Sequence, residues 1–167
     1  MLTTYPSGVR QQNLLAEKIF NIQLEHIVVG NWAAELINSF GEMVKEITAI
    51  PFTTFNEYPL RFYNSDTVEL INSDNPTGHF IKKDDILYLL EELKNRNVQF
   101  IFNESFIDFA EKEKRYTLID GDILEKYPNL VVIKSISKSY GVPCLCLGVL
   151  ASKKTGLVQN VQKNNSI

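Results

Sequence analysis

The chain has 167 residues, a length sufficient for one domain that buries roughly 70% of its unfolded surface. Its net charge of −3 and its pI of about 5.4 give no reason to expect nucleic acid or an anionic membrane as a partner. No apolar stretch approaches the roughly 20 residues of a membrane span. The first residues lack the basic and apolar regions of a signal peptide, so we expect a cytoplasmic protein.

Apolar residues recur at helical and strand spacings in alternation along the chain. The spacing predicts a helix over 11–20, a strand over 26–29, a helix over 33–44 and a strand over 46–50. A strand over 67–71 precedes a turn-rich segment and a helix over 84–93, which Asp84 or Asp85 is placed to cap. Buried strands follow over 98–102, 130–133 and 145–150, and the last dozen residues are amphipathic at best before they fray.

Strands that alternate with helices predict an α/β protein. We expect a three-layer α/β/α sandwich with a mostly parallel sheet, built as a single domain over residues 1–167. Sheets of this kind bind ligands at the carboxyl ends of their strands. The segments directly after each strand are therefore where functional side chains are to be sought.

One such segment, K-S-I-S-K-S-Y-G at 134–141, follows the strand over 130–133. The amine of Lys138 can attack an aldehyde, and the hydroxyls of Ser135 and Ser137 can donate to phosphate oxygens. By itself, a serine-rich segment with one lysine is more often a solvated turn. Cys144 and Cys146 lie one residue apart, directly before and within the predicted strand over 145–150. Two thiols do not make a zinc site alone, and both histidines are distant in sequence, so we expect reduced thiols and no metal.

Three further segments change the interpretation of the lysine segment. They are Y-P-S-G-V-R at 5–10, N-P-T-G at 75–78 and F-N-E-S-F-I-D-F at 102–109. In this order, ending in S-x-S-K-S-Y-G-x-P-x-L-x-L-G at 135–148, they resemble class I and II aminotransferases, which use pyridoxal 5′-phosphate (PLP). The resemblance is strongest to histidinol-phosphate aminotransferases and threonine-phosphate decarboxylases, and it extends from about Tyr5 to Ser152.

The resemblance implies a role for each matching position. Lys138 would form the Schiff base with the cofactor, Asn75 would bind the hydroxyl of its ring, and Phe55 would stack on the ring. The phosphate would be held by serines, by backbone amides at a helix N-terminus and by a tyrosine from the second subunit of a homodimer, which correspond here to Ser135, Ser137, Ala33, Ala34 and Tyr5.

The departures from the family pattern fall at the chemistry. Asn103 replaces the aspartate that pairs with the pyridine nitrogen, and it supplies no charge to keep that nitrogen protonated. Phe106 replaces a tyrosine that faces the ring hydroxyl. Cys146 replaces an arginine that clamps the phosphate, a loss worth about 10- to 100-fold in affinity. Trp32 replaces a glycine that lets the backbone approach the phosphate.

The chain is also shorter than the family pattern. Relative to that pattern it lacks most of the N-terminal segment, a strand and helix between Tyr58 and Asn75, and the C-terminal small domain that binds the substrate carboxylate.

Two hypotheses follow from these matches and departures. The chain is an aminotransferase, moving an amino group between an amino acid or amino-acid phosphate and a 2-oxo acid. Alternatively, it is a catalytically impaired fragment or pseudoenzyme that keeps the fold and weak, lysine-dependent PLP binding. A generic nucleotide-binding domain has less support, because neither G-x-G-x-x-G nor G-x-x-x-x-G-K-[ST] is present.

Overall fold

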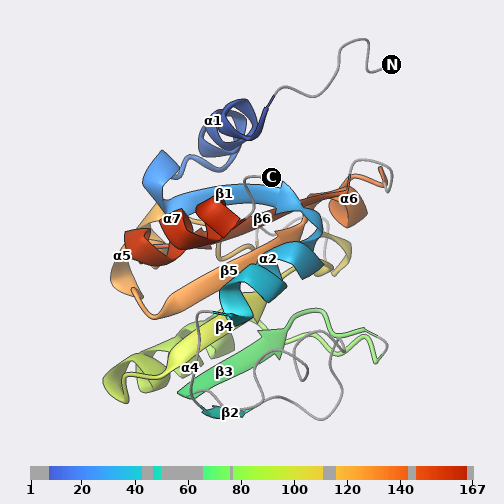
Figure 1. The fold of residues 1–167 in the computed structure, drawn as a ribbon. Coiled ribbons are helices and arrows are strands. Elements are labelled where there is room, and N and C mark those ends of the chain that lie inside the picture. Colours follow the sequence, from blue (N-terminus) through green and yellow to red (C-terminus); the bar gives the residue numbers. More distant parts are fainter. Residues whose placement is uncertain are drawn as a thin grey trace.

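The computed structural model describes residues 8–42, 47–49, 66–75, 77–110, 116–142 and 146–164. Its centre is a six-stranded sheet in the order β1-β6-β5-β4-β3-β2 (Figure 1). The strands are β1 (Ile27–Asn31), β2 (Ile47–Ala49), β3 (Asp66–Ile71), β4 (Gln99–Asn103), β5 (Leu130–Ser135) and β6 (Leu147–Ser152). The four strands β2 to β5 are mutually parallel, whereas β6 runs antiparallel to both of its neighbours. The predicted α/β class with a mostly parallel sheet is confirmed.

Helices cover both faces of the sheet. They are α1 (Val9–Phe20), α2 (Trp32–Gly41), α4 (Lys83–Asn95), α5 (Gly121–Lys126), α6 (Ile136–Ser139) and α7 (Thr155–Asn164), with 3-10 turns η1 (Leu24–His26) and η2 (Ile107–Phe109). Side chains of α2 and α7 pack on one face, and those of α1, α4 and α5 pack on the other. Figure 1 shows α2 and α7 crossing the near face. The arrangement is the predicted three-layer sandwich.

The central strands are buried on both faces, as their nearly continuous apolar sequences predict. In β4, Phe100 and Phe102 point to the α4 side while Ile101 points to the α2 side, and all three are fully buried. The same alternation occurs in β5, where Val131 and Val132 belong to opposite clusters. Packing of the two hydrophobic clusters on the sheet therefore fixes the positions of the polar residues at the strand ends.

The helix boundaries differ from the sequence prediction in ways that have local causes. Lys82, rather than Asp84 or Asp85, is the N-cap of α4, and the two aspartates lie in the first turn. Negative charge there is favoured by the helix dipole, so their effect remains although their position was wrong. Near the end of the chain, Thr155–Asn164 forms α7, whose Val158 and Val161 are buried against the sheet, and the predicted fraying of the last residues lies outside the described residues.

Two short helices were not predicted at all. In α5, the side chain of Asp120 accepts hydrogen bonds from the amides of Asp122 and Ile123, at 3.0 and 3.1 Å. This N-cap stabilises a helix of only six residues, too short to show apolar periodicity. The other, α6, contains Lys138 and spans four residues. In addition, β6 begins at Leu147, so Cys146 precedes the strand in which it was predicted.

At the outer edge of the sheet, a side chain accepts a hydrogen bond from the backbone of β1. The carboxamide oxygen of Asn13 on α1 accepts a 2.7 Å hydrogen bond from the amide of Val29, and Asn13 is 1% exposed. The contact satisfies a backbone donor that an edge strand would otherwise leave open.

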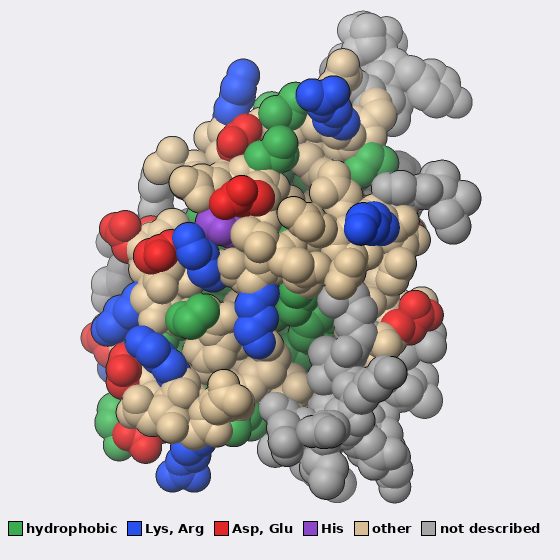
Figure 2. Space-filling view, turned by 60° about the vertical axis from the view of Figure 1, so that its left-hand side comes forward, with side chains coloured by type: hydrophobic (Ala, Val, Ile, Leu, Met, Phe, Trp, Pro, Cys, Tyr) green, Lys and Arg blue, Asp and Glu red, His purple; other side chains and the backbone are tan. Residues whose placement is uncertain are grey.

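The surface and the helices add two observations. None of the described helices is long and apolar enough to cross a membrane. Within the described ranges, no group of three or more His, Cys, Asp or Glu side chains is arranged to bind a metal ion. On the face shown in Figure 2, acidic and basic side chains are interspersed rather than gathered by sign.

Candidate functional site at the carboxyl ends of the strands

The polar residues that the sequence singled out meet at one edge of the sheet. Because β3, β4 and β5 are adjacent and parallel, their carboxyl ends lie together, with Ile71 opposite Asn103 in the register. The amide of Asn72 continues this pairing by donating to the carbonyl of Asn103 at 3.0 Å. Since β6 is antiparallel, its first residues lie at the same edge, with Gly148 opposite Ser135. The carboxyl ends of these three strands therefore converge at the edge where functional side chains were sought.

Asn75 lies in a tight loop that follows β3. The side chain of Asn72 closes this loop by donating to the carbonyl of Ile81 at 2.8 Å and accepting from its amide at 2.9 Å. Within the loop, Gly78 adopts a φ of 73°, a conformation that glycine adopts at little cost. Asn75 is exposed. Its predicted contact with a ring hydroxyl stays a prediction.

Asn103 ends β4 and is 5% exposed. Its carboxamide oxygen accepts a 3.0 Å hydrogen bond from the amide of Ser105. The hydroxyl of Ser105 accepts in turn from the amide of Ser135, also at 3.0 Å, and so joins the loop after β4 to the end of β5. The position predicted to face a pyridine nitrogen is thus occupied by a neutral carboxamide, and hydrogen bonds fix the loop that follows it.

Lys138 lies on α6, directly beyond the end of β5, as predicted. Its amine is over the ring of Phe106, 4.3 Å from the ring centroid. Partial burial lowers the pKa of the Lys138 amine. A lower pKa increases the fraction of neutral amine, the form that attacks a carbonyl carbon.

Ser137 faces the start of β6. Its hydroxyl accepts a 2.8 Å hydrogen bond from the amide of Leu147 and donates to the carbonyl of Leu147 at 3.4 Å. The side chain is buried, with 5% exposure for the residue. Ser137 therefore connects α6 to β6, whatever else it binds.

The start of α2 approaches the same segment. Trp32, the first residue of α2, has a φ of 65°, and Cys146 has a φ of 50°. The amide of Trp32 donates a hydrogen bond to the carbonyl of Cys146. A positive φ strains a side chain as bulky as tryptophan, whereas glycine adopts this conformation at little cost. Ala33 follows, and its backbone nitrogen would lie 2.7 Å from a Cβ added at Gly148.

A partly buried ion cluster near this edge was missed by sequence reasoning. The amine of Lys134 on β5 lies 2.7 Å from a carboxylate oxygen of Asp108 and 3.6 Å from one of Glu104. Lys134 is 5% exposed and Glu104 is fully buried. The carboxylate of Glu104 also accepts from the hydroxyl of Thr117 at 2.5 Å and from the amide of Leu118 at 2.8 Å.

The two carboxylates of this cluster respond differently to their surroundings. Burial raises the pKa of Glu104, and the charge of Lys134 opposes the rise only in part. Burial also acts to raise the pKa of Asp108. There, however, hydrogen bonds from Lys134 and Ser139 and the charge of Lys134 hold the pKa below its ordinary value. Because Ser139 adjoins Lys138, the cluster connects the loop after β4 to α6.

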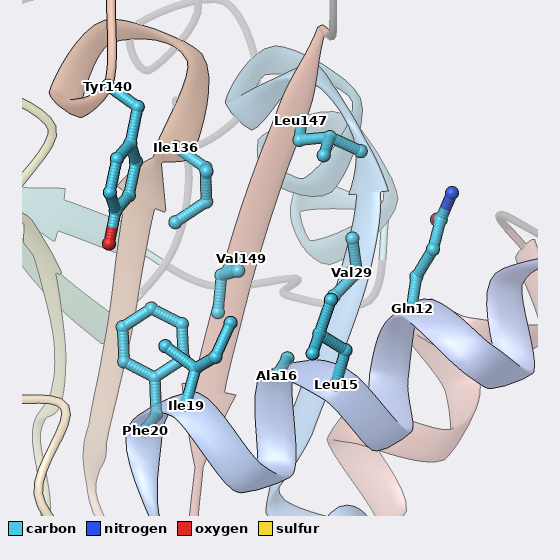
Figure 3. Close-up of a pocket in the computed structure, with 10 residues that line it drawn as sticks. All are labelled: Gln12, Leu15, Ala16, Ile19, Phe20, Val29, Ile136, Tyr140, Leu147 and Val149. Carbon is cyan, nitrogen blue, oxygen red and sulfur yellow. The ribbon is translucent and has the colours of Figure 1, made fainter. Parts of the chain in front are cut away.

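A cavity of about 150 Å³ lies elsewhere, between α1 and the sheet (Figure 3). Apolar side chains of α1, β1, β6 and α6 form most of its wall, including Leu15, Ile19, Val29, Ile136 and Tyr140. None of the predicted site residues that the structure describes lines this cavity. Tyr5, Phe55 and Cys144 lie outside the described residues.

The comparisons with known proteins agree with the geometry. Residues 65–166 match the family model for aminotransferase class I and II. The chain is 30% identical over 181 residues to an L-serine phosphate decarboxylase from Sulfurospirillum multivorans, covering 89% of this chain and 46% of that protein. It is 28% identical over 196 residues to histidinol-phosphate aminotransferase 1 from Mannheimia succiniciproducens, covering 97% and 52%. The chain thus spans about half the length of the curated relatives it matches.

Solved structures show the same fold. The L-threonine-O-3-phosphate decarboxylase from Porphyromonas gingivalis superposes with a TM-score of 0.80 at 18% identity, covering 97% of this chain and 57% of that one. The histidinol-phosphate aminotransferase from Clostridium acetobutylicum gives 0.78 at 19% identity, covering 97% and 56%.

Proposed function

The chain belongs to the class I and II aminotransferase family, and from this premise we propose that it is an aminotransferase-like protein that binds the aldehyde of PLP through Lys138. The observation that supports this most directly is the place of Lys138, whose amine lies over Phe106 beside the end of β4. Membership of the family is the reason for proposing PLP as the cofactor. The lowered pKa of the Lys138 amine suits attack on an aldehyde.

The described residues fit only part of this cofactor. Lys138 suits its aldehyde, and the neutral side chain of Asn103 suits hydrogen bonding to a ring nitrogen without holding a proton on it. The phosphate end fits less well, because the hydroxyl of Ser137 is already engaged with the backbone of Leu147. Lys138 and Asn103 thus suit the aldehyde and the ring of the cofactor, whereas its phosphate has weaker support.

What the residues of this chain do is hold the lysine and the loop around it. Ser105 fixes the loop after β4 to the end of β5. Phe106 lies against the amine of Lys138, and partial burial of that amine lowers its pKa. Asn103 adds no charge. We therefore propose that amino-group transfer between an amino acid, or amino-acid phosphate, and a 2-oxo acid is impaired in this chain. Decarboxylation is a second candidate reaction, because a relative carries that name.

Lysine-dependent binding is tested by replacing Lys138 with alanine. Addition of PLP to the native chain should produce the absorbance band of an imine, and reduction with borohydride should leave a stable mass increase on Lys138. Lys138→Ala should abolish both signals, because the amine of Lys134, the other lysine near the end of β5, is held by Asp108 and Glu104.

A matched control is Lys154→Ala. Partial burial also lowers the pKa of Lys154. This residue, however, follows the end of β6, which lies at the amino ends of the parallel strands, opposite Lys138. Its replacement should leave the band and the label intact. A band that survives in Lys138→Ala, or a label on Lys154, would place the binding elsewhere.

We also propose that two copies of the chain associate. Leu15 and Ile19 on α1 are 58% and 59% exposed and lie beside the apolar cavity, so association would remove this apolar surface from water. Sedimentation velocity at micromolar concentration should show a dimer that Leu15→Glu weakens, whereas Lys18→Glu on the same helix should not. A stable monomer would contradict the proposal.

A further inference from the structure

Resting on the proposed binding through Lys138, we infer that this site does not select for the phosphate of its ligand. The chain binds an unphosphorylated pyridoxal-type aldehyde about as tightly as PLP itself. Three observations at the junction of α2, α6 and β6 carry this inference.

The first observation is the hydroxyl of Ser137. It has a single proton, which is directed to the carbonyl of Leu147, and its oxygen accepts the amide of Leu147 at 2.8 Å. Donation to a phosphate oxygen would require that proton to leave the carbonyl. Any larger shift would unpair a backbone donor at the start of β6, and buried donors are seldom left unpaired. Ser137 is therefore a structural link before it is an anion ligand.

The second observation is the start of α2. A helix N-terminus binds an anion through backbone amides that have no partner within the helix. Here the first of these amides, that of Trp32, donates to the carbonyl of Cys146. The indole of Trp32 stands at the first helical position and is 54% exposed. The amide of Trp32 is therefore already engaged in a hydrogen bond, and its indole occupies space at the start of α2.

The third observation is charge. Lys138 is the only cationic side chain in the segments 31–34, 135–139 and 146–148, which contain the end of β1, the start of α2, α6 and the start of β6. Lys134, directly before these serines, has its amine directed to Asp108 and Glu104. Within these described segments, a phosphate dianion would thus find no cation other than Lys138 to give it the charge-assisted hydrogen bonds that make such contacts strong.

The covalent bond needs no phosphate. The neutral amine of Lys138 adds to the aldehyde carbon, and the carbinolamine then loses one water to give a C=N bond. The carbonyl oxygen leaves with two protons, and no oxidant or reductant takes part. Affinity is then set by this bond and by contacts to the ring, which the two aldehydes share.

The experiment compares PLP with 5′-deoxypyridoxal by titrating the imine absorbance of the full chain. The deoxy compound lacks the phosphate and has no 5′-hydroxyl with which to close on its own aldehyde. The two dissociation constants should agree within about threefold. Inorganic phosphate at millimolar concentration should not displace PLP.

Cys146→Arg tests the cause. It should tighten PLP binding by about 10- to 100-fold and leave the deoxy compound unchanged, because it adds one charge-assisted contact. Cys146→Gln, of comparable length and without charge, is the matched control and should leave the ratio near that of the native chain. Trp32→Gly, which removes the indole and suits the positive φ, should favour PLP over the deoxy compound in the same direction.

The outcomes separate the inference from the function on which it rests. A native chain that prefers PLP by more than about 30-fold, or that releases PLP to inorganic phosphate, would overturn the inference and leave Lys138 binding intact. Failure of both aldehydes to bind, or equal binding by Lys138→Ala, would overturn the proposed function and the inference with it.

Discussion

Gly148→Ala is expected to lower the free energy of unfolding by about 3 kcal/mol, at the upper end of the cost of overpacking. A Cβ at this position would lie 2.7 Å from the nitrogen of Ala33, 2.8 Å from the carbonyl carbon of Trp32 and 2.9 Å from the Cα of Ala33. All three are backbone atoms, so no side-chain rotation can relieve the contact. Urea unfolding followed by circular dichroism measures the loss.

The strain has few places to go. Gly148 pairs with Gly30 of β1 and with Ser135 of β5, so β6 is held on both sides. The start of α2 would therefore have to move, and with it the helix N-terminus at the candidate site. Gly156→Ala is the matched control, because nothing lies within 4 Å of a Cβ there and alanine is favoured in a helix. A loss below about 1 kcal/mol for Gly148→Ala would show that α2 separates from β6 easily.

Lys134→Met should cost about 3–5 kcal/mol at neutral pH, because it leaves the carboxylate of Glu104 buried without a cation. The methionine fills a similar volume, so the loss reports charge rather than a cavity. Lys153→Met is the control for removing a lysine from a more exposed ion pair with Glu125, and it should cost less than about 1 kcal/mol.

The size of the Lys134→Met effect should depend on pH. Burial raises the pKa of Glu104 above its ordinary value of 4.5, and without Lys134 the pKa rises further. The folded state then keeps a proton that the unfolded chain releases, so stability is retained below 4.5 and is lost as the pH rises through the folded-state pKa. The deficit relative to the native chain should thus grow as the pH rises above 4.5, and it should level off once Glu104 is ionised in the folded variant.

Asp108 contributes in the same direction. Burial acts to raise its pKa, but Lys134 and Ser139 hold the pKa low in the native chain. This low pKa stabilises the folded state at pH values above the ordinary pKa of an aspartate. Adding Glu104→Gln to Lys134→Met removes the orphaned charge and should recover more than half of the loss. A deficit that does not change with pH, or that the second substitution deepens, would show that packing rather than charge dominates at Lys134.

The sequence predicted the strand ends better than it predicted what fixes them. Lys138 and Asn103 were placed correctly because apolar strands have a plain pattern and the residues after them meet at one edge. Lys134 was missed because a lone lysine at the end of an apolar strand looks solvated, and its buried partner Glu104 is 30 residues away in sequence. That pairing arises only when β4 and β5 lie side by side.

Helix ends and short helices were harder for a related reason. Propensity and periodicity need several turns to show, and α6 has four residues held by Ser137 and Leu147. The backbone of Cys146 likewise leaves the strand conformation at a φ of 50° where it meets the start of α2, a contact between segments more than one hundred residues apart.

The place of β6 between β1 and β5 also has a consequence for how the chain folds. In the register, Ile27 of β1 lies opposite Ala151 of β6, so the first of the six strands pairs with the last of them. During synthesis β1 has to wait, with its hydrogen-bonding groups unpaired on that side, until residues 147–152 have left the ribosome. Contacts so distant in sequence slow folding and prolong the time for which apolar segments are exposed. The interval before β6 arrives is therefore the stage at which this chain is most prone to aggregate or to need a chaperone.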